Sequence, residues 1–498
     1  MKNYWQNLEP ELRWGFVAFL AVLIFYALSF AASFSIIAEY VLAAILVIIA
    51  AVAFHQSFTL GFAVVFTELV AGSLGRLFIL PFDISIRMAF FAIALVAAII
   101  RLSKNKTERE YIWKRGVVAV WIILAAAILW GLARGLALRP ASAVIADANA
   151  YAYFILLPAF LLAFREKREQ KKLLAAFFGA TAASALLTVI VFYLFTHAIS
   201  EPVLRALYKW VRDYGLGEVT KAPAGFYRVF FQAQIMNFTA FLIGPSLIIR
   251  LTEKKIRNFA FISVALSAAV LFISFSRTFW VSALFAMITG AAFVLISTRF
   301  RPSFKKYAVI CAIFTVIGIT LPFLLSRSVG SAVAARAGNF VSEAAAGSRM
   351  NLLRVLWPEI KKNPIWGYGF GKELTYKTLD PRLLVYFPSG NYTTSAFEWG
   401  WLDFWLKMGA IGPLSFLLLI ATLAVLVKDA IKNSFLTNAE GQNLTAYSAL
   451  ALGIATLGTA IAHIASPWLN HPLGIGLILT AYSVLVTNIT QTGRLQSG

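Results

Sequence analysis

Apolar segments of about 20 residues recur along the whole chain, and no other feature constrains the fold as strongly. A helix of that length crosses the roughly 30 Å hydrocarbon core of a bilayer. Of the 498 residues, 60% are hydrophobic and 13% are charged, whereas soluble domains are about half apolar and a quarter charged. This composition excludes a soluble enzyme, a secreted disulfide scaffold and a disordered protein. It predicts an all-α polytopic integral membrane protein.

The apolar windows predict about 14 transmembrane helices. They span residues 14–30, 36–54, 58–80, 84–100, 117–138, 144–164, 173–196, 229–249, 259–273, 279–296, 307–325, 401–427, 446–464 and 473–486.

The distribution of basic residues supports an even number of spans. The net charge is +22, and from residue 101 onward alternate connections between windows are rich in lysine and arginine. Cytoplasmic loops show this bias when every window crosses the membrane. The basic connections are residues 101–115, 165–172, 250–257, 299–306 and 428–432. We therefore predict that the N and C termini both lie inside, and we attribute much of the charge to topology rather than to nucleic acid.

Two connections on the predicted outer side are long and basic, residues 197–228 and 326–400. Basic outer loops oppose the topology rule, and this departure favours an anionic partner on that side. Alternatively, long loops are translocated across the membrane regardless of their charge. The chain then divides into five regions. These are N-terminal transmembrane helices (1–197), a first outer loop (198–228), core transmembrane helices (229–325), a large helical outer loop between spans 11 and 12 (326–400) and C-terminal transmembrane helices (401–498).

The large outer loop contains one clear helical pattern. Ser348 is a plausible N-cap for a helix over residues 349–362, and Asn363-Pro364 is its stop signal. Pro358 predicts a kink or an earlier end. An amphipathic helix beside the bilayer is expected, with its apolar side formed by Leu352, Leu353, Leu356 and Ile360.

Metal and cofactor sites are not expected. The four histidines are scattered, and Cys311 is the one cysteine, which excludes an intrachain disulfide and a cysteine-based metal site. The usual nucleotide-binding, zinc-hydrolase and serine-hydrolase motifs are absent.

Arg277 interrupts a long apolar stretch. Residues 259–296 are too long for one span, so the segment 274–278 (SFSRT) predicts a tight outer turn or a broken helix. An arginine at this depth is costly unless it snorkels, pairs or lines a polar cavity. Arg277 is therefore either an interface anchor or part of a binding site.

Arg228 occupies a similar outer position before the eighth window. Gln232, Gln234 and Asn237 continue a polar stripe into the membrane, which favours a cavity over a simple anchor. A guanidinium group suits phosphate because its planar fork donates two parallel hydrogen bonds and keeps its charge. Two or three such arginines on one face would hold a diphosphate.

Three outer segments together resemble the O-antigen ligase and polymerase superfamily, often called the Wzy type. They are Phe275-Ser276-Arg277-Thr278, the series Gly347-Ser348-Arg349 to Gly367-Tyr368-Gly369-Phe370-Gly371, and Gly409-Ala410-Ile411-Gly412. The family consists of polytopic glycosyltransferases that use polyprenyl-diphosphate-linked glycans on the outer face of the membrane. The resemblance covers about residues 227–420.

The resemblance implies roles for individual residues. Arg228 and Arg277 match diphosphate-binding arginines, and Arg349 matches the arginine that opens the large-loop helix. Gly367, Gly369 and Gly371 would form a turn where the backbone approaches glycan or phosphate; a flexible loop with positive backbone angles is an equal alternative. The outer-loop aromatic residues, among them Tyr392, offer flat faces for sugars, although interface aromatics are common.

One departure from the family pattern concerns the catalytic base. Ligases have a histidine about a dozen residues before the Gly-x-x-Gly pair, whereas this chain has Glu398. Glu398 is either a general base, because apolar surroundings raise a carboxyl pKa, or an interface carboxylate paired with an arginine. Asp403 is the second candidate. The replacement favours a polymerase over a ligase.

The predicted activity is metal-independent and inverting transfer or polymerisation of polyprenyl-diphosphate-linked glycan repeat units. The expected location is the bacterial inner membrane, with the active site on the outer, periplasmic side. The expected partners are the lipid-linked oligosaccharide, the bilayer and a chain-length regulator, with no nucleic acid. The alternative is a 14-span transporter or flippase with Glu68, Arg76, Asp83, Arg87 and Arg134 along its path. The halves lack the sequence symmetry of many transporters.

Overall fold

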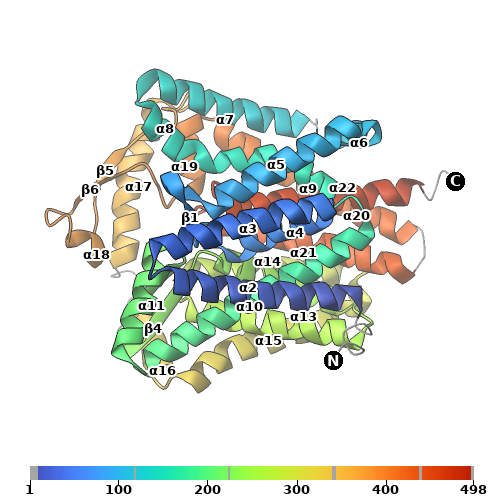
Figure 1. The fold of residues 1–498 in the computed structure, drawn as a ribbon, viewed down its shortest axis with the longest axis horizontal. Helices are drawn as coiled ribbons and strands as arrows, with labels where there is room; N and C mark the ends of the chain where they lie inside the picture. Colours follow the sequence, from blue (N-terminus) through green and yellow to red (C-terminus); the bar gives the residue numbers. More distant parts are fainter. Residues whose placement is uncertain (1–8, 117–118, 222–224, 339–343, 437–439, 495–498) are drawn as a thin grey trace.

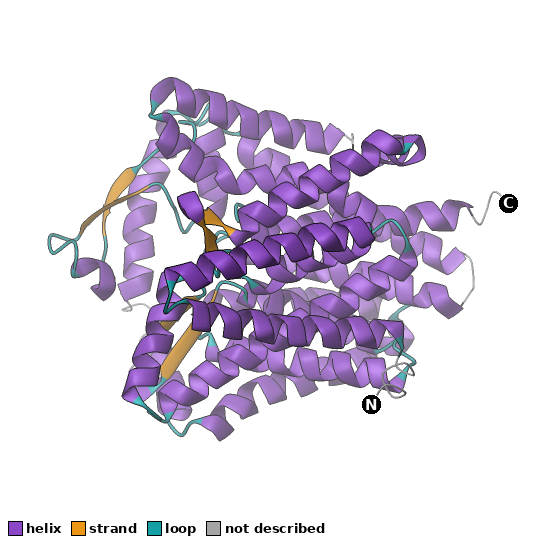
Figure 2. Cartoon of the chain, in the orientation of Figure 1, coloured by secondary structure: helices purple, strands orange, loops and turns teal. Residues whose placement is uncertain are grey.

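The structure is a computed structural model, and it describes residues 9–116, 119–221, 225–338, 344–436 and 440–494. Most of the described chain is helical, and long helices run side by side in one bundle (Figures 1 and 2). This arrangement confirms the predicted all-α polytopic membrane fold.

Twelve helices in the described residues are long and apolar enough to cross a bilayer. Eleven are continuous: α2 (Pro10–Ala32), α3 (Ile36–Gln56), α5 (Ile86–Lys104), α7 (Ala119–Leu138), α10 (Lys167–Thr196), α13 (Lys254–Ile273), α14 (Arg277–Ile296), α15 (Phe304–Leu325), α20 (Ile411–Leu436), α21 (Glu440–Ala462) and α22 (Pro472–Arg494). The twelfth is interrupted and consists of α8 (Ala141–Ala148), the 3-10 helix η2 (Asn149–Leu156) and α9 (Leu157–Ala163).

Two predicted windows form shorter apolar helices, α4 (Phe58–Ala71) and α12 (Gln234–Ile248). The third window was therefore predicted too long. Its helix ends before Ser73 and Gly75, whose positive φ angles of 54° and 80° break the helical path. Each of the fourteen windows contains an apolar helix, while the exact number of crossings stays a prediction.

The described residues also form three two-stranded antiparallel hairpins that were not predicted from the sequence. β1 (Ile79–Leu80) pairs with β2 (Ile84–Ser85) across the 3-10 turn η1 (Pro81–Asp83). β3 (Gly217–Lys221) pairs with β4 (Tyr227–Phe231), and β5 (Leu374–Lys377) pairs with β6 (Asn391–Thr394). Because β4 occupies the start of the eighth window, that helix begins at Gln234 rather than at Val229.

Helix α12 lies in the centre of the bundle, where the helices pack closely. All of its residues are buried, and it contacts α13 and α21 extensively. On the neighbouring pair α2 and α10, a Cβ on Gly179 would overlap the backbone oxygen of Gly15. Small residues allow such close approach between membrane helices. Arg228 thus lies just before the most enclosed helix of the bundle.

The two ends of the bundle differ (Figure 1). One end carries the start of α2, the end of α22 and α6 (Lys106–Gly116), and we call it the basic end. The other, here called the loop end, carries α11 (Glu201–Asp213), α16 (Val329–Gly338), α17 (Ala344–Lys362), α18 (Pro381–Leu384) and the β5–β6 hairpin. Helix α17 runs across the ends of the bundle helices.

Helix α17 differs from its prediction. It begins at Ala344, so Ser348 lies inside it, and the Ser348 hydroxyl accepts a hydrogen bond from the Leu379 amide (2.7 Å). Pro358 does not end the helix. Its apolar side packs against β5 and the segment around α19 (Gly400–Met408), so protein rather than lipid covers that side. The buried cluster consists of Leu352, Leu356, Ile360, Leu374, Phe397 and Leu406.

The window predicted over residues 401–427 is divided. Helix α19 ends at Met408, Gly409 has a φ of 72°, and α20 begins at Ile411. A left-handed backbone at this position is far more accessible to glycine than to other residues. The break separates the short helix that carries Asp403 from the membrane-spanning helix.

Candidate functional site

Arg228 is tied to the turn that carries Arg277. The Arg228 Nε donates a hydrogen bond to the backbone oxygen of Ser274 (2.7 Å). Ser274 ends α13, and Arg277 is the first residue of α14. The structure therefore brings the two predicted diphosphate-binding arginines to one turn at the loop end.

The local sequence explains this turn. Phe275 has a φ of 49°, and the Ser276 hydroxyl caps α14 by accepting from the Phe279 amide (3.5 Å). The residue before strand β4 packs on the turn through its ring, with the Phe226 and Phe275 centroids 4.3 Å apart. The predicted interruption of the apolar stretch is thus confirmed as a tight turn between α13 and α14.

Two residues of the polar stripe after Arg228 are enclosed by protein. Gln234 and Asn237 are fully buried. The Gln234 amide donates to the Val229 oxygen (3.1 Å), and the Asn237 oxygen accepts from the Ser267 hydroxyl (3.0 Å). These groups fix the start of α12 against its neighbours, and the polar cavity inferred from this stripe stays a prediction.

Glu398 forms an ion pair with Arg349 on α17. The side chains are 51% and 35% exposed, respectively, so the pair is accessible from the loop end. The Trp399 indole donates to the Arg349 backbone oxygen (2.9 Å), which holds the segment before α19 against α17. The residue at the position of the family histidine is therefore an exposed carboxylate beside a guanidinium group.

Asp403, the second candidate base, is fully buried. Its carboxylate lies 2.6 Å from the Lys407 ammonium, which also lies 2.6 Å from the Asp147 carboxylate. The Asn470 amide donates to the other Asp403 oxygen (3.0 Å). Burial raises the pKa of the Asp403 carboxyl to about 6, while Lys407 opposes the shift. This network joins α8, α19 and the connection between α21 and α22.

The segment Gly367–Gly371 is packed into the bundle. All three of its glycines have positive φ angles, 66°, 79° and 78°. A Cβ on Gly369 would overlap the backbone nitrogen of Gly135 on α7, and one on Gly367 would overlap that of Gly409. The positive backbone angles agree with the prediction. The close approach, however, is to other backbone of the protein.

Two arginines from the N-terminal half hold this glycine segment. Arg134 donates to the Gly367 oxygen (2.7 Å), and Arg139 donates to the Tyr368 oxygen (2.5 Å). The Gly371 amide donates to Asp147 (2.7 Å), which links the segment to the buried Lys407 network. Sequence reasoning did not find these contacts, because each joins residues more than 200 positions apart.

Tyr392 belongs to an aromatic cluster on the β5–β6 hairpin. Its ring lies 5.9 Å from Tyr376 and 5.4 Å from Phe387, both in edge-on geometry. Burial raises the pKa of the Tyr376 phenol to about 12. The cluster provides aromatic faces beside the Arg349–Glu398 pair. The Glu398 charge raises the Tyr376 pKa further, and the Arg349 charge opposes this effect.

Sequence reasoning also missed the connection between α21 and α22. The His463 ring accepts from the Trp468 and Leu469 amides (3.0 and 3.1 Å), and Trp468 stacks on Phe279 in the first turn of α14 (5.7 Å). Burial lowers the pKa of His463 to about 3, so this histidine is neutral. The available signal was that the connection between the last two windows lies on the predicted outer side.

The residues proposed for a transport path form separate local contacts. Glu68 and Arg87 make a buried pair (3.0 Å), whereas Arg76 and Asp83 make an exposed pair (2.7 Å). Arg134 is bound to the glycine segment. Each contact fastens one connection at the loop end. Within the described residues, no group of three or more potential metal ligands comes together.

Comparison with known families gives one match. Residues 262–417 match the model of the O-antigen ligase family. No curated protein matches the chain. The matched region runs from α13 to the first turns of α20 and excludes Arg228. It contains the three resembling segments and Arg277, Arg349, Gly367, Gly369, Gly371, Tyr392, Glu398 and Asp403. The match confirms the predicted resemblance to the O-antigen ligase and polymerase superfamily over this segment of the membrane-spanning chain.

Proposed function

We propose that this protein is a metal-independent, inverting glycosyltransferase that polymerises polyprenyl-diphosphate-linked glycan repeat units. The reaction takes place on the periplasmic face of the bacterial inner membrane, at the loop end. The hydrogen bond from Arg228 to Ser274 is the observation that carries the proposal, because it joins an arginine outside the matched segment to the turn of Arg277. That turn is the motif shared with the superfamily.

In the proposed complex, Arg228 and Arg277 bind the donor diphosphate and Arg349 assists. The guanidinium groups stabilise the negative charge that develops on the leaving polyprenyl diphosphate. The lipid tail of the donor lies in the bilayer between helices. The sugars lie towards the β5–β6 hairpin, where Tyr392 and Tyr376 offer stacking faces.

The reaction breaks the bond between the anomeric carbon and the diphosphate oxygen. The acceptor hydroxyl attacks from the opposite side, which inverts the anomeric centre, and Glu398 takes its proton. Exposure supports Glu398 over Asp403 as the base, because an acceptor cannot reach a carboxylate that is fully buried beside Lys407. We further propose that the acceptor is a second lipid-linked glycan, since Glu398 replaces the histidine of the ligases. A chain-length regulator is a proposed partner.

The direct test is to incubate the purified protein with a lipid-diphosphate-linked oligosaccharide, without metal or a second acceptor, and to separate the products on a gel. We expect a ladder of repeat units. Arg228→Ala and Arg277→Ala should each lower transfer at least a hundredfold, because a charge-stabilising donor of this kind contributes about 10²–10³ in rate.

Arg205→Ala is the matched control. Arg205 lies in the same outer connection, but its side chain is 77% exposed and pairs with Glu201 on the surface of α11. It should keep normal transfer. Near-normal transfer by both Arg228→Ala and Arg277→Ala would remove the diphosphate assignment. Absence of a ladder, together with glycan transfer to a lipid-core acceptor once that acceptor is added, would identify a ligase.

A further inference from the structure

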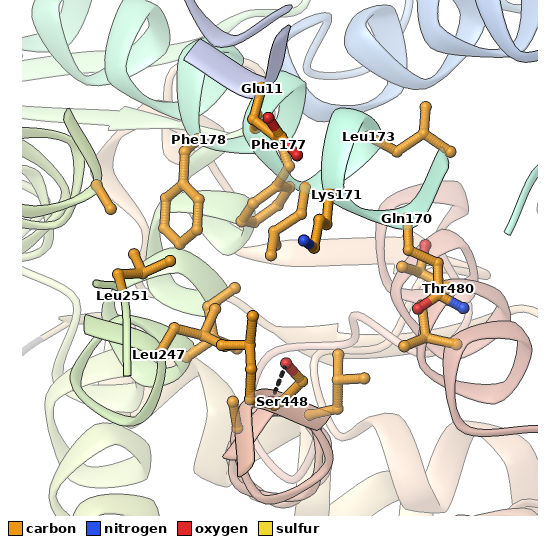
Figure 3. Close-up of a pocket in the computed structure, with 18 of the residues that line it drawn as sticks. Glu11, Gln170, Lys171, Leu173, Phe177, Phe178, Leu247, Leu251, Ser448 and Thr480 are labelled. Carbon is orange, nitrogen blue, oxygen red and sulfur yellow. Dashed lines mark hydrogen bonds between the residues drawn. The ribbon is translucent and has the colours of Figure 1, made fainter. Parts of the chain in front are cut away.

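A deep cavity opens at the basic end of the bundle (Figure 3). Its volume is about 300 Å³, and residues of α2, α4, α10, α12, α13, α21 and α22 line it. The walls are mainly apolar, and they include Phe66, Phe177, Phe178, Ile243, Leu247 and Leu477. None of the predicted glycan or diphosphate residues is among the lining residues.

The depth of the cavity matches one leaflet of a bilayer. Along α10, the lining residues extend from Lys167 to Phe178. With a rise of 1.5 Å per residue, this distance is about 16 Å, or roughly half of the 30 Å hydrocarbon core. An acyl chain that enters from the basic end therefore finds apolar walls along its leaflet.

The mouth of the cavity is basic. Lys167, Lys171 and Arg250 line it, together with Glu11 and Glu253. Figure 3 shows the Lys171 ammonium pointing into the space between α10 and the facing helices. In the part of the chain that the structure describes, neither lysine has an ion-pair partner.

The spacing of the two lysines favours the binding of an anion at the mouth of the cavity. Lys167 and Lys171 lie one helical turn apart, where like charges repel each other. An anion at the mouth would relieve that repulsion. Basic pockets between membrane helices bind anionic lipid headgroups in this way.

We propose that this cavity binds an anionic phospholipid of the adjacent leaflet. One acyl chain occupies the apolar walls, and Lys167, Lys171 and Arg250 hold the phosphate. The proposed diphosphate site lies at the opposite end of α12, whose 15 residues span about 22 Å. The lipid site is therefore separate from the donor site and does not depend on the proposed function.

Native mass spectrometry of the whole protein tests this proposal with two probes, phosphatidylglycerol and phosphatidylethanolamine. We expect one phosphatidylglycerol to stay bound and phosphatidylethanolamine to bind at least tenfold more weakly. Lys167→Ala/Lys171→Ala should weaken phosphatidylglycerol binding about thirtyfold, because each lysine near an anionic headgroup contributes about a fivefold change. Thr480→Phe, which fills the cavity without changing its charge, should also weaken binding at least tenfold.

Lys305→Ala/Lys306→Ala is the matched control, since it removes two exposed lysines at the same end outside the cavity. It should leave binding unchanged. Thermal melting of each variant separates lost binding from lost folding. Equal retention of the two lipids, an equal loss in the control or undiminished binding by folded Thr480→Phe would each overturn the proposal.

Discussion

Two acid–base pairs at the loop end have their carboxylates only five residues apart in the sequence, at Glu398 and Asp403, and their surroundings differ sharply. Glu398 and Arg349 are about half and one third exposed, whereas Asp403 and Lys407 are almost completely enclosed. A surface ion pair is worth little to stability, but a buried charge left without its partner is very costly. The comparison indicates that one pair is available for chemistry and that the other fastens helices together.

The largest expected effect is on catalysis. Glu398→Gln should lower glycan transfer by about 10²–10⁴-fold, the usual contribution of a positioned general base. The thermal unfolding midpoint should hardly change, because the exposed pair contributes at most about 1 kcal/mol. Transfer by the gel assay and melting of the same preparation provide both readouts. The opposite outcome would be normal transfer by Glu398→Gln together with a folded but inactive Asp403→Asn. It would assign the base to Asp403, so the buried pair rather than the exposed pair would act in the chemistry.

The next effect is on stability. Lys407→Met should destabilise the protein by about 3–5 kcal/mol, because it leaves the buried carboxylates of Asp403 and Asp147 without their shared cation. We expect a much lower unfolding midpoint in detergent. Lys362→Met is the matched control, since that lysine is 69% exposed in its pair with Glu359. Equal midpoints for the two variants would refute the structural role of the buried pair.

Gly369 of the glycine segment and Gly390 differ in the space around them, which allows a direct comparison of crowded and open surroundings. Gly369 and Gly390 have similar φ angles, 79° and 73°. A Cβ on Gly369 would overlap the backbone of α7, whereas one on Gly390 would come no closer than 3.4 Å to its neighbours. Gly369→Ala should therefore be about 1–3 kcal/mol less stable than Gly390→Ala, the usual cost of overpacking. Equal stability would show that the backbone angle alone requires glycine at position 369.

The smallest effect concerns Glu359, which pairs with Lys362 (2.8 Å) and Lys372 (3.2 Å) on the surface of α17. The hydrogen bond from Lys362 lowers the pKa of Glu359. The stabilisation is then present above the ordinary glutamate pKa and is lost as the pH falls through the lowered value. Glu359→Gln should cost less than about 1 kcal/mol at pH 7. Its unfolding midpoint should approach that of the unchanged protein in acid, and a difference that grows on acidification would contradict this prediction.

The sequence predicted the membrane helices and the turn at Arg277 because both depend on local patterns. Apolar windows define spans, and a polar interruption in an overlong window defines a turn. The start of the eighth window was misread because Val229, Phe230 and Phe231 form an apolar run. Such a short run does not distinguish a strand from the end of a helix.

The remaining site features depend on contacts between distant segments. The spacing of Asp403 and Lys407 is visible on one helix, but the second carboxylate, Asp147, comes from a different part of the chain. Glycines at 367, 369 and 371 predicted positive backbone angles, yet nothing local indicated that α7 fills the space beside them. The sequence alone identified the candidate side chains, whereas their contact partners are apparent only from the three-dimensional structure.

The anchoring of the glycine segment limits how the matched region can be transplanted or evolved. Residues 262–417 contain the shared motifs, but Arg134, Arg139 and Asp147 hold their glycine segment from outside that region. The region is therefore not an autonomous folding unit. A chimaera that exchanges it between relatives will keep the loop in place only if α7 and α8 travel with it. Substitutions in these two helices can thus alter the proposed active face without changing any shared motif.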